Sequence, residues 1–149
     1  MTQKNNVDGI LLLDKPLKMS SNQAIQRIKK KFNIKKLGHT GTLDPLATGL
    51  LPVCIGRATR ISQFLIDSDK TYQAKIKLGV KTSTGDREGE IIETSYIGNS
   101  HDSLSIDQVL QTFVGNQEQI PPMYSALKHK GKRLYKLALQ GVDVPRKAR

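Results

Sequence analysis

The chain has 149 residues, 37% of them hydrophobic, and its 24 Lys and Arg against 13 Asp and Glu give a formal net charge of +11. This length fits one domain or part of a larger one, and no apolar run approaches the ~18 residues of a membrane span. One cysteine and three histidines exclude a metal site of ordinary ligand spacing. The polar N-terminus has no apolar segment typical of a signal peptide, so we expect a cytoplasmic protein that binds neither a membrane nor a metal.

The charge is unevenly distributed along the chain. Residues 85–120 hold seven acids and one base, whereas residues 128–149 hold eight bases and one acid. Because each phosphate that Lys or Arg neutralises releases counterions, the excess favours a nucleic acid as partner. The alternative is a basic protein whose charge serves only solubility.

The first half of the chain predicts two strands and two helices. GILLLDKP, residues 9–16, is a short apolar run closed by a proline and predicts a buried strand. Ser20 and Gln23 have the spacing of a capping box and predict the start of a helix. One face of that helix is apolar and consists of Ala24, Ile25, Ile28 and Phe32. Residues 49–55 predict a strand, and residues 58–66 a helix with Ile61, Phe64 and Leu65 directed inward.

The second half alternates strands, helices and a loop. KTYQAKIKLGV, residues 70–80, has the period of two of a half-buried strand, and GEIIET, residues 89–94, is its expected neighbour. A third helix is predicted from Ser105 to Phe113, a rigid loop over residues 119–127, and a last helix over residues 133–141 that ends at its glycine. The short turns between strands favour an α+β fold with a mixed, largely antiparallel sheet flanked by helices.

The stretch LGHTGTLDPLATGLLPVCIG, residues 37–56, places one carboxylate, Asp44, in a turn before an apolar run. An Asp before Pro is common turn chemistry. However, glycines on both sides would let the backbone approach a ligand, and the strand that follows is a rigid base. A carboxylate can serve as general base or covalent nucleophile, but no second carboxylate nearby supports a glycosidase pair. His39 could equally be a proton donor, a phosphate contact or a loop hydrogen bonder.

Four segments carry a likeness to a known family: GILLLDKP, GHTGTLDPLATGLLPVCIG, DSDKTYQAKIKLG and QIPPMYSALKHKGKRLYKLALQG. In this order they resemble the amino-terminal half of bacterial TruB-type tRNA pseudouridine synthases. The likeness extends from Gly9 to Arg149. Archaeal and eukaryotic relatives that act with guide RNA share the H-x-G-x-L-D-P core, whereas PLATGLLPV is similar to the stand-alone tRNA type.

The resemblance implies roles for several residues. Asp44 matches the family's catalytic Asp, His39 the histidine that contacts the flipped nucleotide, and Tyr72 the tyrosine that stacks on the target base. Without the resemblance, Tyr72 is a core residue of a half-buried strand. Asp86 matches a family acid near the RNA-facing side, although a turn acid is the simpler interpretation. Further candidate RNA contacts are Lys15, Thr40, Thr42, Lys128, Lys130, Lys132 and Arg133.

The family isomerises uridine 55 in the T arm of tRNA, breaking the N-glycosidic bond and rejoining the sugar to C5 of uracil, with no cofactor or metal. The resemblance therefore implies an RNA-binding isomerase of tRNA processing, monomeric in its full-length form, with tRNA as its partner. Asp44 would add to uracil, add to C1′ or take a proton from the sugar.

Residues 1–149 match only the amino-terminal part of the family's pseudouridine synthase-like catalytic domain. The K-G-T-Y-I-R-type strand, whose Arg pairs with the catalytic Asp, and the carboxy-terminal RNA-binding domain have no counterpart in these residues. We therefore expect the isolated chain to be inactive. The alternative function is a non-catalytic RNA-binding fragment that lacks the rest of the active site.

Overall fold

A computed structural model describes residues 5–98 and 103–149 of the chain. The chain divides after Gln73 into two compact units, which we call unit 1 (residues 1–73) and unit 2 (residues 74–149). In the described part of the chain, no helix combines the length and the apolar character needed to span a membrane.

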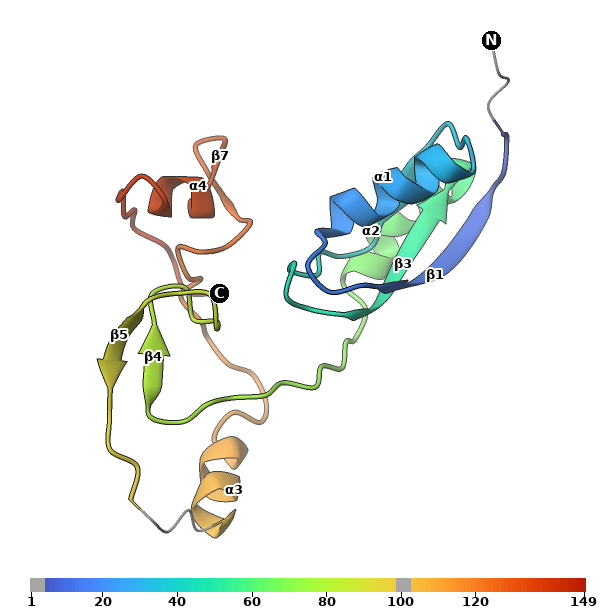
Figure 1. Cartoon of the computed structure of the whole chain (residues 1–149). Helices are drawn as coiled ribbons and strands as arrows, with labels where there is room; N and C mark the ends of the chain where they lie inside the picture. The colour runs from blue at the N-terminus through green and yellow to red at the C-terminus, as the bar shows by residue number, and fades with distance from the viewer. Residues whose placement is uncertain (1–4, 99–102) are drawn as a thin grey trace. The chain divides into compact units, whose positions relative to one another are not determined.

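Unit 1 is built on a three-stranded antiparallel sheet in the order β1-β3-β2 (Figure 1). β1 (Gly9–Lys15) pairs with β3 (Gly49–Ile55) along its whole length, so that Gly9 lies opposite Ile55 and Lys15 opposite Gly49. β2 (Leu37–His39) pairs with the other edge of β3. The remaining elements of unit 1 are α1 (Ser21–Lys31), the 3-10 turn η1 (Gly56–Arg60) and α2 (Ser62–Ile66).

The core of unit 1 lies between α1 and the central strand. Ile25 of α1 packs against Leu51 and Val53 of β3, and Leu13 and Leu37 of the flanking strands pack around them. Each fully buried aliphatic side chain of this kind contributes about 1.5–3 kcal/mol. The core therefore holds α1 against one face of the sheet.

The predicted capping box at the start of α1 is confirmed. The N–H of Gln23 donates to Ser20 Oγ at 3.2 Å, and the N–H of Ser20 donates to Gln23 Oε1 at 2.9 Å. These two bonds satisfy backbone groups that the helix itself leaves unpaired.

The burial predicted for β1 is wrong, although the strand itself is confirmed. Residues that pair across antiparallel strands share a face, so Leu11 and Leu13, opposite Val53 and Leu51, lie on the face that α1 covers. Ile10 and Leu12 lie on the other face and are 48% and 66% exposed.

The helix predicted over residues 58–66 is also only partly confirmed. It is divided into η1 and the five-residue α2, and Ile61 and Phe64, both expected inside, are 42% and 73% exposed. Phe32, predicted on the apolar face of α1, follows the last residue of that helix as its C-cap and is likewise exposed.

The described residues of unit 2 form two β-hairpins and two helices (Figure 1). β4 (Val80–Thr82) pairs with β5 (Ile91–Thr94), and β6 (Lys128–His129) pairs with β7 (Lys132–Arg133), both antiparallel. α3 (Ser103–Gln111) begins two residues before the predicted helix and ends two residues before its predicted end. α4 (Leu134–Ala138) buries Leu134 and Leu137, and Gly141 follows it with φ +71°, which is the expected helix stop.

The strand predicted over residues 70–80 is wrong for most of its length. Residues 71–77 are irregular and exposed, and β4 begins only at Val80. A strand needs a neighbour for its N–H and C=O groups, and among residues 5–98 and 103–149 none pairs with residues 71–77. The expected pairing with GEIIET is confirmed only where β4 meets β5.

The predicted α+β class is confirmed. All strand pairs in the described part of the chain are antiparallel, apart from one isolated parallel bridge between Asn5 and Ile34. The strands form three small sheets, of which the largest supports the loop that carries Asp44.

Candidate functional site

The loop that carries Asp44 joins β2 to β3 and is fixed by backbone hydrogen bonds. The N–H of Thr40 donates to the Pro52 carbonyl at 3.2 Å, and the Pro45 carbonyl accepts from the N–H of Lys18 at 2.8 Å. Within the loop, the N–H of Ala47 donates to the Asp44 carbonyl at 3.0 Å and closes a turn. The backbone at Asp44 therefore has a defined conformation.

Ser21 fixes the residue directly before Asp44. Its hydroxyl accepts from the N–H of Leu43 at 2.9 Å and donates to the Leu43 carbonyl at 3.0 Å. Ser21 is buried, and it is the first residue of α1. The sequence gives no sign of this contact, because the two residues are 22 positions apart.

The carboxylate of Asp44 is exposed, and it has no hydrogen bond or ion pair within the described residues. Hydrogen bonds fix the main chain on both sides of Asp44, whereas its carboxylate makes none within the described residues. A carboxylate in this state can accept a proton, attack an electrophilic carbon or orient a hydroxyl group.

His39 ends β2 and is half-buried next to the same loop. Its Nδ1 contacts the carbonyl oxygen of Gly41. This contact needs the proton on Nδ1, which leaves Nε2 as an acceptor in the neutral ring and as a donor in the charged ring. The contact supports the loop hydrogen-bonding role that the sequence left open for His39.

A cavity of about 460 Å³ opens beside this loop. It is lined by loop residues 40–43, by residues 50–52 at the start of β3, and by Leu65 with residues 68–72. Thr40, Thr42 and Tyr72, three of the residues singled out from the sequence, therefore line one cavity. Tyr72 is 67% exposed rather than packed in a core, and Asp44 follows the lining residue Leu43 directly.

Asp69 and Lys70 also line this cavity and were missed by sequence reasoning. The ammonium of Lys70 donates to the carbonyls of Ile66 and Ser68, both at 2.6 Å. These bonds close the turn after α2, which brings Lys70 and Tyr72 to the cavity. The segment DSDK belongs to the family resemblance, and the predicted strand begins at its last residue, but neither prediction assigns a role to Asp69 or Lys70.

Lys15 has a different position from the one expected for an RNA contact. It is fully buried, and its ammonium donates to the Pro16 carbonyl at 2.9 Å and to the Met19 carbonyl at 2.6 Å. These bonds hold the chain between β1 and α1. Lys15 thus stabilises the fold near the loop, and its charge is not available to a phosphate.

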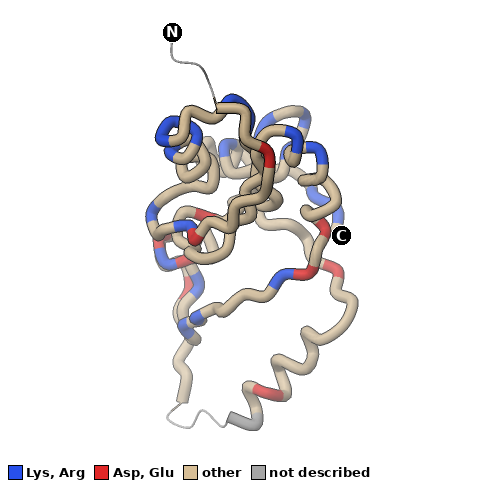
Figure 2. Tube along the Cα trace, turned by 90° about the vertical axis from the view of Figure 1, so that its right-hand side faces the viewer, with Lys and Arg blue, Asp and Glu red and all other residues tan. Residues whose placement is uncertain are grey.

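The other candidate cations are gathered on one hairpin of unit 2. Lys128 and Arg133 face each other across β6 and β7, and Lys130 is in the turn between the strands. Lys130 and Gly131 have φ of 48° and 82°, as a two-residue hairpin turn requires. Lys128, Lys130, Lys132 and Arg133 are all exposed. Lys and Arg, blue in Figure 2, occur in both units, whereas α3 contains none.

Asp86 stands in the turn between β4 and β5, as the simpler interpretation of the sequence predicts. Its carboxylate accepts a hydrogen bond from Thr84 Oγ1 at 2.6 Å and another from the N–H of Glu88 at 2.9 Å. These bonds, led by that of Thr84, lower the pKa of Asp86. The carboxylate of Asp86 therefore stabilises its own turn.

Two features bear on metal and thiol chemistry. Among the described residues, no three His, Cys, Asp or Glu side chains gather as a metal site would require. Cys54 is buried in β3, as expected, and burial raises the pKa of its thiol, which makes it a poor nucleophile.

Comparisons with known proteins agree on one family. The sequence model described as "TruB family pseudouridylate synthase (N terminal domain)" matches residues 29–149. A tRNA pseudouridine synthase B of Nitrosococcus oceani is 54% identical over 147 residues, which are 99% of this chain and 47% of the relative. The tRNA pseudouridine synthase B of Escherichia coli K12 is 53% identical over 144 residues, which are 97% of this chain and 45% of the relative. The chain thus spans about half the length of the curated relatives it matches.

A solved structure supports the same assignment at the level of the fold. A Cbf5-Nop10-Gar1 complex contains a chain with a TM-score of 0.53 and 29% identity, over 80% of this chain and 31% of the other. Two of the segments that resemble the family, residues 38–56 and 67–79, supply the Asp44 loop and most of the lining of its cavity. The chain therefore belongs to the TruB family of pseudouridylate synthases.

Proposed function

We propose that this chain provides the catalytic carboxylate of an enzyme that converts uridine 55 in the T arm of tRNA to pseudouridine. The curated relatives are named tRNA pseudouridine synthase B, which supports tRNA as the substrate. The observation that carries the proposal is the unengaged carboxylate of Asp44, held next to a cavity that an exposed tyrosine also lines.

The cavity has the size and the lining for a nucleobase. Small-molecule sites measure about 300–1,000 Å³, and this one, at about 460 Å³, falls within that range. A uridine in a folded T loop must leave its stack to be reached. Stacking on an aromatic side chain is worth about 1–3 kcal/mol per base, and Tyr72 is exposed enough to supply it.

The reaction is an isomerisation, so its atoms balance within the nucleotide. The bond between N1 and C1′ breaks, a bond between C5 and C1′ forms, C5 loses a proton and N1 gains one. Asp44 would act by adding to uracil, by adding to C1′ or by taking a proton from the sugar. The ring of His39, fixed through Nδ1, would contact the extruded nucleotide through Nε2.

The RNA strand outside the cavity would be held by phosphate contacts. The exposed hairpin cations Lys128, Lys130, Lys132 and Arg133 are suited to this role, because phosphate contacts position a strand without reading its sequence. Thr42, exposed at the cavity, would donate a hydrogen bond to the nucleotide, whereas the buried Thr40 would act through the loop backbone.

A second candidate function is RNA binding without turnover by the 149 residues alone. It is favoured by the absence, within the described residues, of a cation paired with Asp44, and by the exposed, unpaired segment 71–77. Without a paired cation, the carboxylate is less precisely oriented towards a substrate.

A single-turnover assay separates the two functions. Excess chain is incubated with a tRNA transcript, pseudouridine is mapped by carbodiimide-dependent stops, and the E. coli relative serves as the positive control. Stops at position 55 would establish the chain as an enzyme by itself. Binding without stops would support the second function, and neither binding nor stops would refute both.

A further inference from the structure

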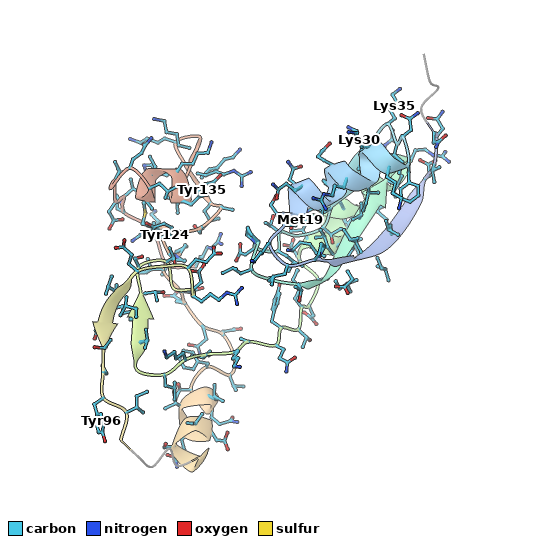
Figure 3. The ribbon with its side chains drawn as sticks, viewed as in Figure 1. Met19, Lys30, Lys35, Tyr96, Tyr124 and Tyr135 are labelled. Atoms are coloured by element: carbon cyan, nitrogen blue, oxygen red, sulfur yellow. The ribbon has the colours of Figure 1, made fainter. Side chains whose placement is uncertain are left out.

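A second cavity, of about 440 Å³, lies at the other end of the sheet of unit 1. It is lined by the segment before β1, by residues 34–36 before β2, and by residues of η1 after β3. Gly9, Leu37 and Ile55 meet at this end of the sheet, whereas the Asp44 loop enters β3 at Gly49. Figure 3 shows the two ends, with Lys35 beyond the last turn of α1 and Met19 before its first turn.

Cationic side chains dominate the lining of this second cavity. Lys35, Lys36, Arg57 and Arg60 contribute four positive charges, and Asp8 is the one carboxylate. Within the described residues, Lys35, Lys36 and Arg60 have no ion-pair partner, and all three are exposed. Lys29, Lys30 and Lys31 in the last turn of α1 precede this segment and add to the local positive potential.

Asp8 forms its ion pair with Arg57 and orients that side chain, so it does not neutralise the charges of Lys35, Lys36 and Arg60. Its carboxylate accepts from the N–H and from Nε of Arg57, both at 2.6 Å. The backbone bond, followed by the side-chain bond, lowers the pKa of Asp8. The terminal nitrogens of the guanidinium group make no hydrogen bond in the described structure, and the side chain is 84% exposed. Arg57 therefore presents donors in a fixed direction.

Gly56 permits this arrangement. Its φ is +59°, and a Cβ atom at this position would collide with the carboxylate of Asp8 and the Val7 carbonyl. The close approach of residues 7–8 to η1 thus requires a glycine.

We propose that this second cavity binds phosphate groups of the RNA strand whose uridine reaches the Asp44 cavity. β3 has seven residues and, at a rise of ~3.3 Å per residue, separates the two sites by roughly 20 Å. The RNA would then be held at both ends of the sheet. This inference rests on the proposed function, because it takes RNA as the substrate.

The lining fits a polyphosphate better than an acidic protein segment. Protein interfaces need an apolar core surrounded by a polar rim, but among the described residues Val7 and Ile34 are the only aliphatic side chains in this lining, and Ile34 is buried. Exposed cations around an open cavity instead match the contacts that proteins make with phosphate oxygens.

The test compares two variants of equal charge. One replaces the unpaired cations of the cavity (K35Q/K36Q/R60Q), and the other replaces exposed cations of unit 2 (K75Q/K77Q/R87Q). Binding of a T-arm stem-loop transcript is measured over a range of salt concentrations. At ~0.7–0.9 per lost phosphate contact, the cavity variant should lower the slope of log K against log salt by about 2–3, and the control should change it by less than about 0.5.

Single substitutions provide the same test if the triple variant does not fold. Each one should lower the slope of log K against log salt by about 0.7–0.9. If the wild-type chain does not bind the transcript, the proposed function fails together with this inference. If it binds and the cavity variant keeps the wild-type slope, only the inference fails. Hexaglutamate is the competing probe. If it displaces the transcript from the wild-type chain but not from the cavity variant, and binds as tightly as RNA, the site belongs to an acidic protein segment.

Discussion

Ser21→Ala should loosen the loop that carries Asp44. Ser21 Oγ makes two hydrogen bonds with the Leu43 backbone, at 2.9 and 3.0 Å, and is itself buried. A net hydrogen bond is worth about 0.5–1.5 kcal/mol, so losing both should cost about 1–3 kcal/mol. Leu43 is half-buried, so water can replace part of the lost hydrogen bonding. We therefore expect a loss in the lower half of this range, about 1–2 kcal/mol.

Urea denaturation and amide exchange together measure this effect. At an m-value of about 2 kcal/mol/M, a loss of about 1–2 kcal/mol lowers the midpoint by roughly 0.5–1 M. The amide of Leu43 should also lose its protection from hydrogen exchange. Ser68→Ala is the control, because Ser68 is exposed and its hydroxyl makes no hydrogen bond within the described residues. If Ser21→Ala matches this control and the Leu43 amide stays protected, the hydroxyl does not fix the loop.

Three further predictions follow from the same contacts. Tyr72→Ala should weaken binding of the T-arm transcript by about 1–3 kcal/mol, because the stacking surface is lost; Tyr72→Phe should bind like the wild type, and equal losses in both variants would contradict stacking. Replacing the hairpin cations Lys128, Lys130, Lys132 and Arg133 by Gln should lower the salt slope of binding by about 3, at ~0.7–0.9 each, and an unchanged slope would remove the hairpin from the RNA interface. The Arg57 contacts lower the pKa of Asp8, so the stability they add is present at neutral pH and is lost as the pH falls through this lowered value, below about 4. Asp8→Asn should therefore flatten the urea midpoint against pH in that acidic range, and an equally steep profile would show that Asp8 contributes nothing to it.

The features that the sequence predicts well depend on contacts close in the chain. The capping box of Ser20 and Gln23 and the helix stop at Gly141 each involve residues within a few positions. The strand over residues 49–55 is equally clear, because its apolar run supplies the core residues Leu51 and Val53. Local geometry and apolar periodicity therefore determine these elements.

The features that the sequence missed depend on partners far along the chain. Period-two alternation over residues 70–80 shows only that a strand could form, whereas its formation also requires a neighbour to pair with. Lys15 is an exception, because its partners, the carbonyls of Pro16 and Met19, are close in the chain, but the sequence does not show that the side chain is buried. The contacts of Ser21 with Leu43 and of Asp8 with Arg57 span 22 and 49 positions. No pattern in the sequence links the members of these pairs.

The candidate site likewise combines residues that the sequence predicts with residues that it does not. Asp44 and His39 were singled out from the sequence itself, whereas their specific roles and the role of Tyr72 come from the resemblance; the structure places Tyr72 and the residues before Asp44 at one cavity. Asp69 and Lys70 line that cavity only because the turn after α2 folds back on itself. The second cavity could not be predicted, since it combines three segments that are separated in the sequence.

The role of Asp44 is tested most directly in a chimera. The matching 144 residues of the E. coli relative are replaced by this chain, with either Asp44 or Asn at that position. Pseudouridine at position 55 of a tRNA transcript is mapped under single-turnover conditions, and transcript binding is measured in parallel. The Asp44 chimera should form pseudouridine, and the Asn variant should bind the transcript equally well but form none, because the amide is nearly isosteric but carries no charge. Conversion by the Asn variant within tenfold of the Asp44 chimera would show that this carboxylate is not the catalyst.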